Sequence, residues 1–336
     1  MKRLATLGAL LALTVSAGTA LATPGVGVTS APVLARGTNQ TAQLVSTAAN
    51  RDVVTTQLTI APGATTGWHT HPGPVTIVVT AGAVSFWRTP DCEKRVLEAG
   101  DSINLSDAAM APGGGTGLDL ARNEGTVSAT VMLTHLNVPV GSTTLLQHVS
   151  STPCTSAPQE FASSAGLTST GIARGTLAAA LNYDILSGTD ILNQTVTIAP
   201  GGTTGWHSHP GTTIVQVSQG TGTFQHDDCT TTTYPTGTVL VDFPRQVHQF
   251  RNDGTIPLVF HVTYTNVPAA SVFRLDEAAP RCAGTAAAAA TAAPALLPNT
   301  AASGAEAFGA LPLVLAAILA SSGTLLAMGM RRRQTR

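Results

Sequence analysis

The sequence predicts an all-β protein that consists of two tandem copies of one antiparallel barrel, and three observations support this prediction. Thr, Val, Gly and Ala dominate the 336 residues between frequent turn residues, a composition that favours many short strands over long helices. A chain of this length usually holds two domains with appendages. The stretch Gly67–Gly73 (GWHTHPG) returns almost unchanged as Gly205–Gly211 (GWHSHPG).

The repeat extends well beyond these seven residues. Ala35–Thr38 (ARGT) returns as Ala173–Thr176, 138 residues later. The offset has fallen to 129 residues where Asn123–Thr126 (NEGT) matches Asn252–Thr255 (NDGT). The first copy therefore carries extra residues, which we assign to the Gly-rich segment 110–117.

Short extended segments alternate with Gly and Pro turns in both copies. Strands that are short and closely spaced favour an antiparallel fold that is closed or sandwiched. We expect strands at 46–60, 75–80, 83–88 and 127–138 in the first copy, and at 191–198, 214–218, 222–225, 238–243 and 258–265 in the second.

The beginning of the chain carries an export signal. Residues 1–22 have the pattern of a signal peptide, because Lys2 and Arg3 precede an apolar run that ends in small residues. This pattern predicts cleavage before Thr23. The alternative is that the segment stays in place as an uncleaved anchor.

The other end carries a membrane signal. Segment 308–330 is apolar and uncharged, which is long enough for a transmembrane helix. The arginine-rich tail 331–336 should then stay in the cytoplasm. Residues 283–307 are rich in Ala, Thr and Pro and are expected to form a spacer rather than a core.

A short motif lies within this spacer, Leu297-Pro298-Asn299-Thr300-Ala301. A Leu-Pro-x-Thr pentapeptide followed by an apolar span and a basic tail resembles the Gram-positive cell-wall sorting signal that sortases cut, although Ala301 replaces the usual Gly. The resemblance implies sortase as a partner. The alternative is a plain C-terminal membrane anchor, and with either one the bulk of the protein is expected outside the cell, held at the cell wall or membrane.

The four cysteines follow the repeat. Cys92 and Cys229 each come directly after an aspartate, while Cys154 and Cys282 close their copies. An exported chain with an even number of cysteines should form disulfides. Of the three possible connectivities, repeat symmetry selects Cys92–Cys154 with Cys229–Cys282.

The charge of the chain excludes one class of partner. The formal net charge is −1 and only 10% of the residues are charged. Nucleic-acid-binding domains carry a basic patch or stripe, so no nucleic-acid partner is expected.

The repeated stretch has the spacing of a metal-binding motif. Its two histidines stand at i and i+2 on a predicted strand. Such side chains share one face and lie about 6.6 Å apart along the strand. Both imidazoles can therefore reach one metal ion.

The doubled motif resembles the cupin superfamily, in particular a bicupin with two jelly-roll barrels. The first family motif, G-x5-H-x-H-x3,4-E-x6-G, matches Gly201, His207, His209 and Gly220, with Thr213 at the glutamate position. The second motif, G-x5-P-x-G-x2-H-x3-N, matches Gly237, Pro244, Gln246, His248 and Asn252. The resemblance covers about 35–154, a degenerate first copy, and 173–282.

Cupins usually hold a divalent metal with three histidines and that glutamate. The resemblance therefore implies a site at His207, His209 and His248 for Fe, Cu, Zn, Mn or Ni. Without the glutamate the metal keeps its full charge, which should attract an anionic ligand and lower the pKa of bound water. The alternative is that the three histidines are polar barrel residues hydrogen-bonded to water.

The first copy offers a second, weaker site. The motifs give His69, His71 and Asp119, while Val75 takes the glutamate position. Two histidines with one carboxylate are typical of non-haem iron sites. A surface turn is the alternative place for Asp119, because the alignment crosses the Gly-rich insertion.

Three further residues are expected to line the ligand pocket of the second copy: Trp206, Thr213 and His261. The alternatives are packing at the rim for Trp206 and a core position for His261. No residue is assigned as a general acid or base.

Two functions follow as hypotheses. The resemblance implies a metal-dependent oxidoreductase, dioxygenase-like, that acts on a small organic molecule through the second copy. The alternative is a non-enzymatic cell-surface protein that binds a metal or a small ligand, which the absence of the glutamate from both copies favours.

Overall fold

The computed structural model describes residues 25–105 and 117–280. Every helix or strand assigned within these ranges is a β-strand, which confirms the all-β prediction. The described residues contain no helix of the length and apolarity that a membrane span requires. The predicted signal peptide, Gly-rich insertion, spacer and transmembrane segment lie outside the described residues. The chain divides into two units, 1–301 and 302–336, and every described residue lies in the first.

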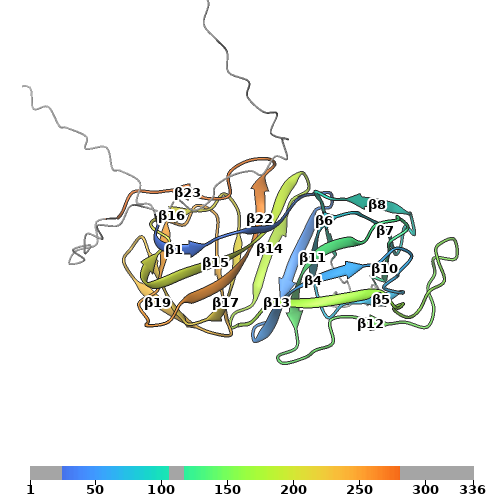
Figure 1. The fold of residues 1–336 in the computed structure, drawn as a ribbon, viewed down its shortest axis with the longest axis horizontal. Helices are drawn as coiled ribbons and strands as arrows, with labels where there is room; N and C mark the ends of the chain where they lie inside the picture. Colours follow the sequence, from blue (N-terminus) through green and yellow to red (C-terminus); the bar gives the residue numbers. More distant parts are fainter. Residues whose placement is uncertain (1–24, 106–116, 281–336) are drawn as a thin grey trace, which may run out of the picture. The chain divides into compact units, whose positions relative to one another are not determined.

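The first half forms two facing sheets (Figure 1). One sheet has the order β9-β6-β11-β4, and the other has the order β12-β5-β10-β7-β8. The strands are β2 Val33–Asn39, β3 Gln43–Thr47, β4 Arg51–Ile60, β5 His69–Thr70, β6 Val75–Ala81, β7 Ala83–Arg88, β8 Arg95–Glu98, β9 Asp101–Leu105, β10 Asp119–Arg122, β11 Ala129–Val138 and β12 Gln147–His148. The expected strand 46–60 is two strands, separated at Asn50, whose φ is 55°.

The second half repeats this plan. Strands β20-β17-β22-β15 form one wall, and β19-β18-β21 with β16 and β23 form the other. Strand β15 pairs with both β22 and β21, so the two walls belong to one 16-stranded sheet that also contains β9-β6-β11-β4. The strands are β13 Leu167–Leu177, β14 Leu181–Ile185, β15 Thr189–Thr203, β16 His207–Ser208, β17 Thr213–Gln219, β18 Thr221–His226, β19 Thr231–Pro235, β20 Thr238–Asp242, β21 His248–Arg251, β22 Leu258–Pro268 and β23 Leu275–Asp276. An N-terminal strand, β1 Val26–Ser30, adds to β15.

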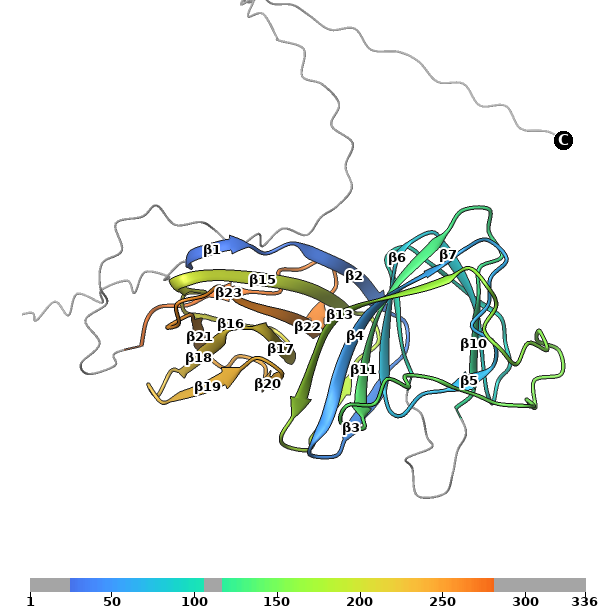
Figure 2. The same ribbon diagram turned by 60° about the horizontal axis from the view of Figure 1, so that its bottom comes forward.

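The two halves exchange strands. Strand β2 pairs in parallel with β9 of its own half and antiparallel with β15 of the other half. Strand β13, its counterpart in the repeat, pairs in parallel with β20 and antiparallel with β4. Figure 2 shows β1 and β2 running beside β15, while β13 lies beside β4. This exchange is not part of the prediction from the sequence.

The repeated ARGT segment makes the exchange contacts. Arg36 donates from Nε to Asp190 at 2.7 Å, and Arg174 donates from Nη1 to Asp52 at 2.5 Å. The repeated glycine allows the parallel strand to approach, because a Cβ on Gly37 would lie 2.7 Å from the backbone oxygen of Asp101. An arginine of each half therefore forms an ion pair with a buried aspartate of the other half.

The interface has a two-fold character. Strands β3 and β14 are counterparts in the repeat, and they pair antiparallel with Val45 opposite its own counterpart, Tyr183. The hydroxyls of Thr134 and Thr263, also counterparts, lie 3.1 Å apart. One buried apolar cluster draws on both halves: Ala35, Val45, Val53, Val78, Met132, Leu136, Leu177, Leu181, Ile185, Ile191, Ile214 and Val239.

A disulfide joins Cys92 to Cys154 as predicted. It lies in an apolar cluster with Trp68 and Trp87. Cys229 is also disulfide-bonded, and its predicted partner Cys282 lies outside the described residues.

Candidate metal centre

Gly205 orients the first histidine of the second half. The residue has a φ of +73°, a conformation that glycine adopts without a steric penalty. Its carbonyl oxygen then accepts the Nδ1–H of His207 at 2.8 Å. Gly67 does the same for His69, with a φ of +67° and a 2.8 Å hydrogen bond. The Gly-Trp-His part of the repeat is therefore a device that fixes an imidazole ring.

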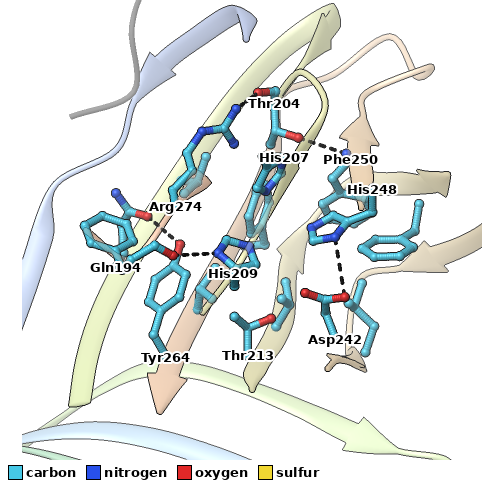
Figure 3. A pocket seen from close by; sticks show the side chains of 17 residues that line it. Gln194, Thr204, His207, His209, Thr213, Asp242, His248, Phe250, Tyr264 and Arg274 are labelled. Carbon is cyan, nitrogen blue, oxygen red and sulfur yellow. Dashed lines mark hydrogen bonds and ion pairs between the residues drawn. The ribbon is translucent and has the colours of Figure 1, made fainter. Parts of the chain in front are cut away.

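The other two histidines are anchored in the same way. His209 donates from Nδ1 to the carbonyl oxygen of Phe273 at 2.8 Å, and His248 donates from Nδ1 to that of Gln246 at 3.0 Å. A ring that donates from Nδ1 has its lone pair on Nε2, the atom that binds metals. The three side chains converge, with one ligand atom of each within 4.8 Å of the others (Figure 3).

Burial keeps these imidazoles neutral. His207, His209 and His248 are each at most 5% exposed. Burial lowers the pKa of His209 to about 4 and the pKa values of the other two well below their ordinary value, because a charged ring loses its hydration. Three neutral imidazoles with free Nε2 lone pairs suit a divalent transition metal.

The cavity beside the histidines is small and mixed in character. It has a volume of about 40 Å³. Thr213 lines it as predicted, and so do the buried side chains of Gln194, Tyr264 and Arg274 (Figure 3). Arg274 also donates to the backbone oxygen of Thr204 at 2.8 Å, so its guanidinium is held in place at the cavity wall.

Asp242 is a site residue that the sequence reasoning missed. It is 1% exposed, lines the cavity, and holds Oδ1 3.4 Å from Nδ1 of His248. Neither carboxyl oxygen has a hydrogen-bond partner among the described residues. Burial raises the pKa of this carboxyl to about 8.

Asp242 lies next to the position where the family motif has its glutamate. Asp242 lies directly across the β17–β20 pairing from Thr213, which occupies the glutamate position. In the first half the same pair is Val75 and Leu105. The second half therefore has a carboxyl near the histidines, but on the neighbouring strand. The expected strand 238–243 already placed Asp242 on the same face as Leu240, which is the signal that could have found it.

Two predicted pocket residues lie elsewhere. Trp206 is buried but does not line the cavity, because neighbouring side chains on a strand point to opposite faces and His207 points inward. His261 also lies outside the cavity, since Phe260 and Val262 take the inward positions of β22. His261 instead contacts Thr195 Oγ1 at 3.1 Å, on the side of the strand that faces the other half.

The first half also gathers its predicted residues. Asp119 opposes His69 in the β5–β10 pairing, and its Oδ1 lies 3.2 Å from Nε2 of His69. The Nε2 atoms of His69 and His71 are 3.2 Å apart. Burial, with the charge of His69, lowers the pKa of His71 to about 3, and burial raises the pKa of Asp119. Asp119 is thus buried at the histidines rather than in a surface turn.

The motif asparagines have a structural role. Asn252 donates from Nδ2 to the backbone oxygens of Ile198 and Ile256, at 2.9 and 2.8 Å. Asn123 makes the same pair of contacts in the first half, to Ile60 and Val127. The repeated asparagine therefore closes the same loop in each half.

Comparison with protein families identifies part of this architecture. Residues 194–264 match the cupin domain family. The second half contains a cupin domain. This cupin domain runs from β15 to β22 and includes all three histidines of the site. A search of curated protein sequences returned no match for the chain.

Solved structures show weak likenesses to the chain. An oxalate decarboxylase from Bacillus subtilis is 14% identical over 73% of this chain and 77% of its own, with a TM-score of 0.32. A structure of the same enzyme, described with Mn(II) centres, is 12% identical over 69% and 77%, with a TM-score of 0.33. A Klebsiella pneumoniae protein with a double-stranded β-helix domain is 24% identical over 26% and 75%, with a TM-score of 0.24. At these scores the likenesses support no argument about the cupin domain's activity.

Proposed function

We propose that the second half binds a divalent transition metal through His207, His209 and His248. One observation supports the proposal above all others. Each imidazole donates its Nδ1–H to a backbone carbonyl, which leaves Nε2 with the free lone pair, and ligand atoms of the three rings lie within 4.8 Å of one another. Histidines that served only as polar core residues would not need the same ring nitrogen fixed in all three cases.

The residues around the triad favour a small anion as the ligand or substrate. Arg274 brings a guanidinium to the cavity wall, and three neutral imidazoles add no negative charge. Tyr264 donates to Gln194 at 2.8 Å, which fixes a second polar pair on the same wall. When bound, the metal would supply Lewis-acid or redox chemistry.

Asp242 gives this site a group that can hold or release a proton. Its carboxyl lines the same cavity as the histidines, and burial raises its pKa to about 8. General acids and bases work best with a pKa near the operating pH. We therefore propose a metal-dependent oxidoreductase, dioxygenase-like, that acts on a small organic anion with Asp242 as its proton-transfer residue.

The size of the cavity favours a second candidate, a non-enzymatic protein that binds a metal or a small ligand. A cavity of about 40 Å³ has room for a few water-sized groups only. Oxygen uptake by the iron- or copper-loaded protein, measured against phenols, thiols and dicarboxylates, separates the two. Uptake that Asp242→Asn abolishes supports the enzyme, and tight metal binding without turnover supports the binding protein.

Metal content tests the proposed site itself. The purified protein should retain about one metal ion per chain more than His207→Ala/His209→Ala. The matched double variant His69→Ala/His71→Ala removes the equivalent pair of the first half and should retain the second-half ion. Equal metal content in wild type and His207→Ala/His209→Ala would refute the proposal.

Export and surface anchoring belong to the same proposal. The signal-like segment 1–22, the motif 297–301 and the apolar segment 308–330 support them. The Cys92–Cys154 disulfide agrees, because disulfides persist mainly outside the reducing cytosol. Mass spectrometry of the mature protein should find an N-terminus at Thr23. A C-terminus at Thr300 indicates sortase processing, a retained Arg336 indicates a membrane anchor, and an intact Met1 in a cytosolic fraction contradicts export.

A further inference from the structure

The first-half barrel contains a cavity that differs from the one beside the three histidines. Its volume is about 120 Å³, against about 40 Å³ in the second half. Its walls are mainly aliphatic and include Leu58, Ile77 and Leu133. An enclosed apolar cavity of roughly 150 Å³ stays dry and binds benzene, so this cavity is of the size that accepts one ring.

Two pairs of counterpart residues that line the cavities differ in size. Val131 of the first half corresponds to Phe260 of the second, because each faces the matching residue of its neighbouring strand, Leu58 or Val196. Both side chains line their cavities. The ring of Phe260 packs at 5.0 Å against that of Phe250, whereas the first half has Ala121 at the latter position. The second-half cavity is filled by rings that the first half lacks.

The rims of the two cavities also differ in charge. His71 donates from Nδ1 to the carbonyl oxygen of Leu145, as His209 does to that of Phe273, at 2.8 Å in both cases. The next residue is Leu146 in the first half and Arg274 in the second, and each lines its cavity. The first-half cavity thus has an aliphatic group where the second has a cation.

The first-half cavity is also lined by buried polar side chains. Asp119 and His135 both line it, and they are 2% and 4% exposed. Nδ1 of His135 has no hydrogen-bond partner among the described residues, and neither has Oδ2 of Asp119. Buried polar atoms of this kind are costly unless they find a partner. A hydroxyl group can serve here, because it both donates and accepts.

We propose that the first-half cavity binds a small neutral molecule, a single ring that carries one hydroxyl group. The ring occupies the aliphatic part of the cavity and the hydroxyl group meets Asp119 and His135. A carboxylate is disfavoured, because the first-half cavity has Leu146 where the other cavity has the guanidinium of Arg274. The inference goes beyond the proposed function, since it concerns the other cavity and requires no metal in the second half.

Phenol is the probe that tests this assignment, with benzoate as the charged comparison. Calorimetric titration of the purified protein should show saturable phenol binding at one site per chain and at least tenfold weaker binding of benzoate. Val131→Phe places in the first half the residue that the second half already has, and it should weaken phenol binding at least tenfold. Val262→Leu, the matched exchange in the second-half cavity, should leave phenol binding unchanged.

A second variant keeps the test valid if Val131→Phe does not fold. His135→Leu removes the polar partner and retains the apolar cavity, so phenol binding should weaken about fivefold, the loss expected for one hydrogen bond. The proposal is overturned by the absence of saturable phenol binding. It is equally overturned by undiminished binding in folded Val131→Phe or by benzoate binding as tightly as phenol.

Discussion

A buried carboxyl such as that of Asp242 costs folding free energy when no hydrogen bond offsets its lost hydration. The first half has Leu105 at the same position. Asp242→Leu should therefore stabilise the metal-free protein by roughly 1–3 kcal/mol, measured by urea unfolding in the presence of a chelator. A destabilised variant would show that the carboxyl is held by contacts outside the described residues.

The same carboxyl should make stability depend on pH in a defined direction. Burial raises its pKa from 3.8 to about 8, so the folded state keeps the proton to a higher pH than the unfolded state. Its contribution is present below about pH 4 and is lost as the pH rises through 8. Unfolding curves of wild type and Asp242→Leu should diverge over this window, and parallel pH profiles would argue against a neutral carboxyl in the folded protein.

The contribution of His261 to stability should depend on pH in the opposite direction. Burial at the interface lowers its pKa from 6.5 to about 4, so the unfolded state takes up a proton first. Its contribution to stability is present above pH 6.5 and is lost toward pH 4, at up to about 1.4 kcal/mol per pH unit. His261→Met, which introduces the counterpart residue Met132, should lose less stability than wild type between pH 6.5 and 4. Equal losses in both proteins would contradict this reading.

At the scale of elements, the exchanged strands β2 and β13 depend on two buried aspartates. Asp190 accepts hydrogen bonds from Arg36 and Thr38, and Asp52 accepts them from Arg174 and Thr176. Removing the charge of Asp190 leaves Arg36 without its ion-pair partner, although its Nη2 still donates to the backbone oxygen of Ser271.

Asp190→Asn should therefore lower the free energy of unfolding by about 3 kcal/mol, as expected when one partner of a buried ion pair is removed. Asp52→Asn should cost less, because the side chain of its partner Arg174 is 36% exposed. Asp253→Asn provides the control, because the Arg251–Asp253 pair is exposed and such pairs contribute about 0–1 kcal/mol. If denaturant unfolding gave Asp190→Asn and Asp253→Asn the same small loss of stability, the Arg36–Asp190 ion pair would not stabilise the strand exchange.

Some features of the strands could be predicted from the sequence and others could not. Alternation within a strand is local, so the shared face of His207 and His209 could be predicted before the structure was known. The ARGT repeat was also visible, but its role was not, because Arg36 and Asp190 are far apart in the chain and pairing between halves leaves no local pattern. Asp242 was missed for a similar reason, since its register against Thr213 is set by strand pairing.

The direction in which His261 points depends on how the two halves pack together. Strand β22 has buried side chains on both faces, because one face lines the cavity and the other meets the first half. Periodicity alone does not separate these faces, and so His261 was assigned to the wrong one. Asp119 could be aligned with the histidine position of the motif, because the repeated turn sequence that begins at Asn123 fixes the alignment across the insertion.

The whole molecule should not divide into independent halves. Each half donates a strand to the other, and both contribute to one buried apolar cluster. Residues 25–166 and 167–280, produced separately, should not give monomers that unfold cooperatively, whereas co-expression should give a complex that purifies as one species. Cooperative melting of either half as a monomer in calorimetry would contradict this view of the exchange.

Anomalous diffraction from metal-soaked crystals would show whether His207, His209 and His248 hold a metal ion. We expect a peak bonded to the Nε2 atoms of all three histidines, at about 2.0–2.1 Å if the metal is zinc. A peak only at His69, His71 and Asp119, or no peak at the second-half triad at saturating metal, would contradict this expectation.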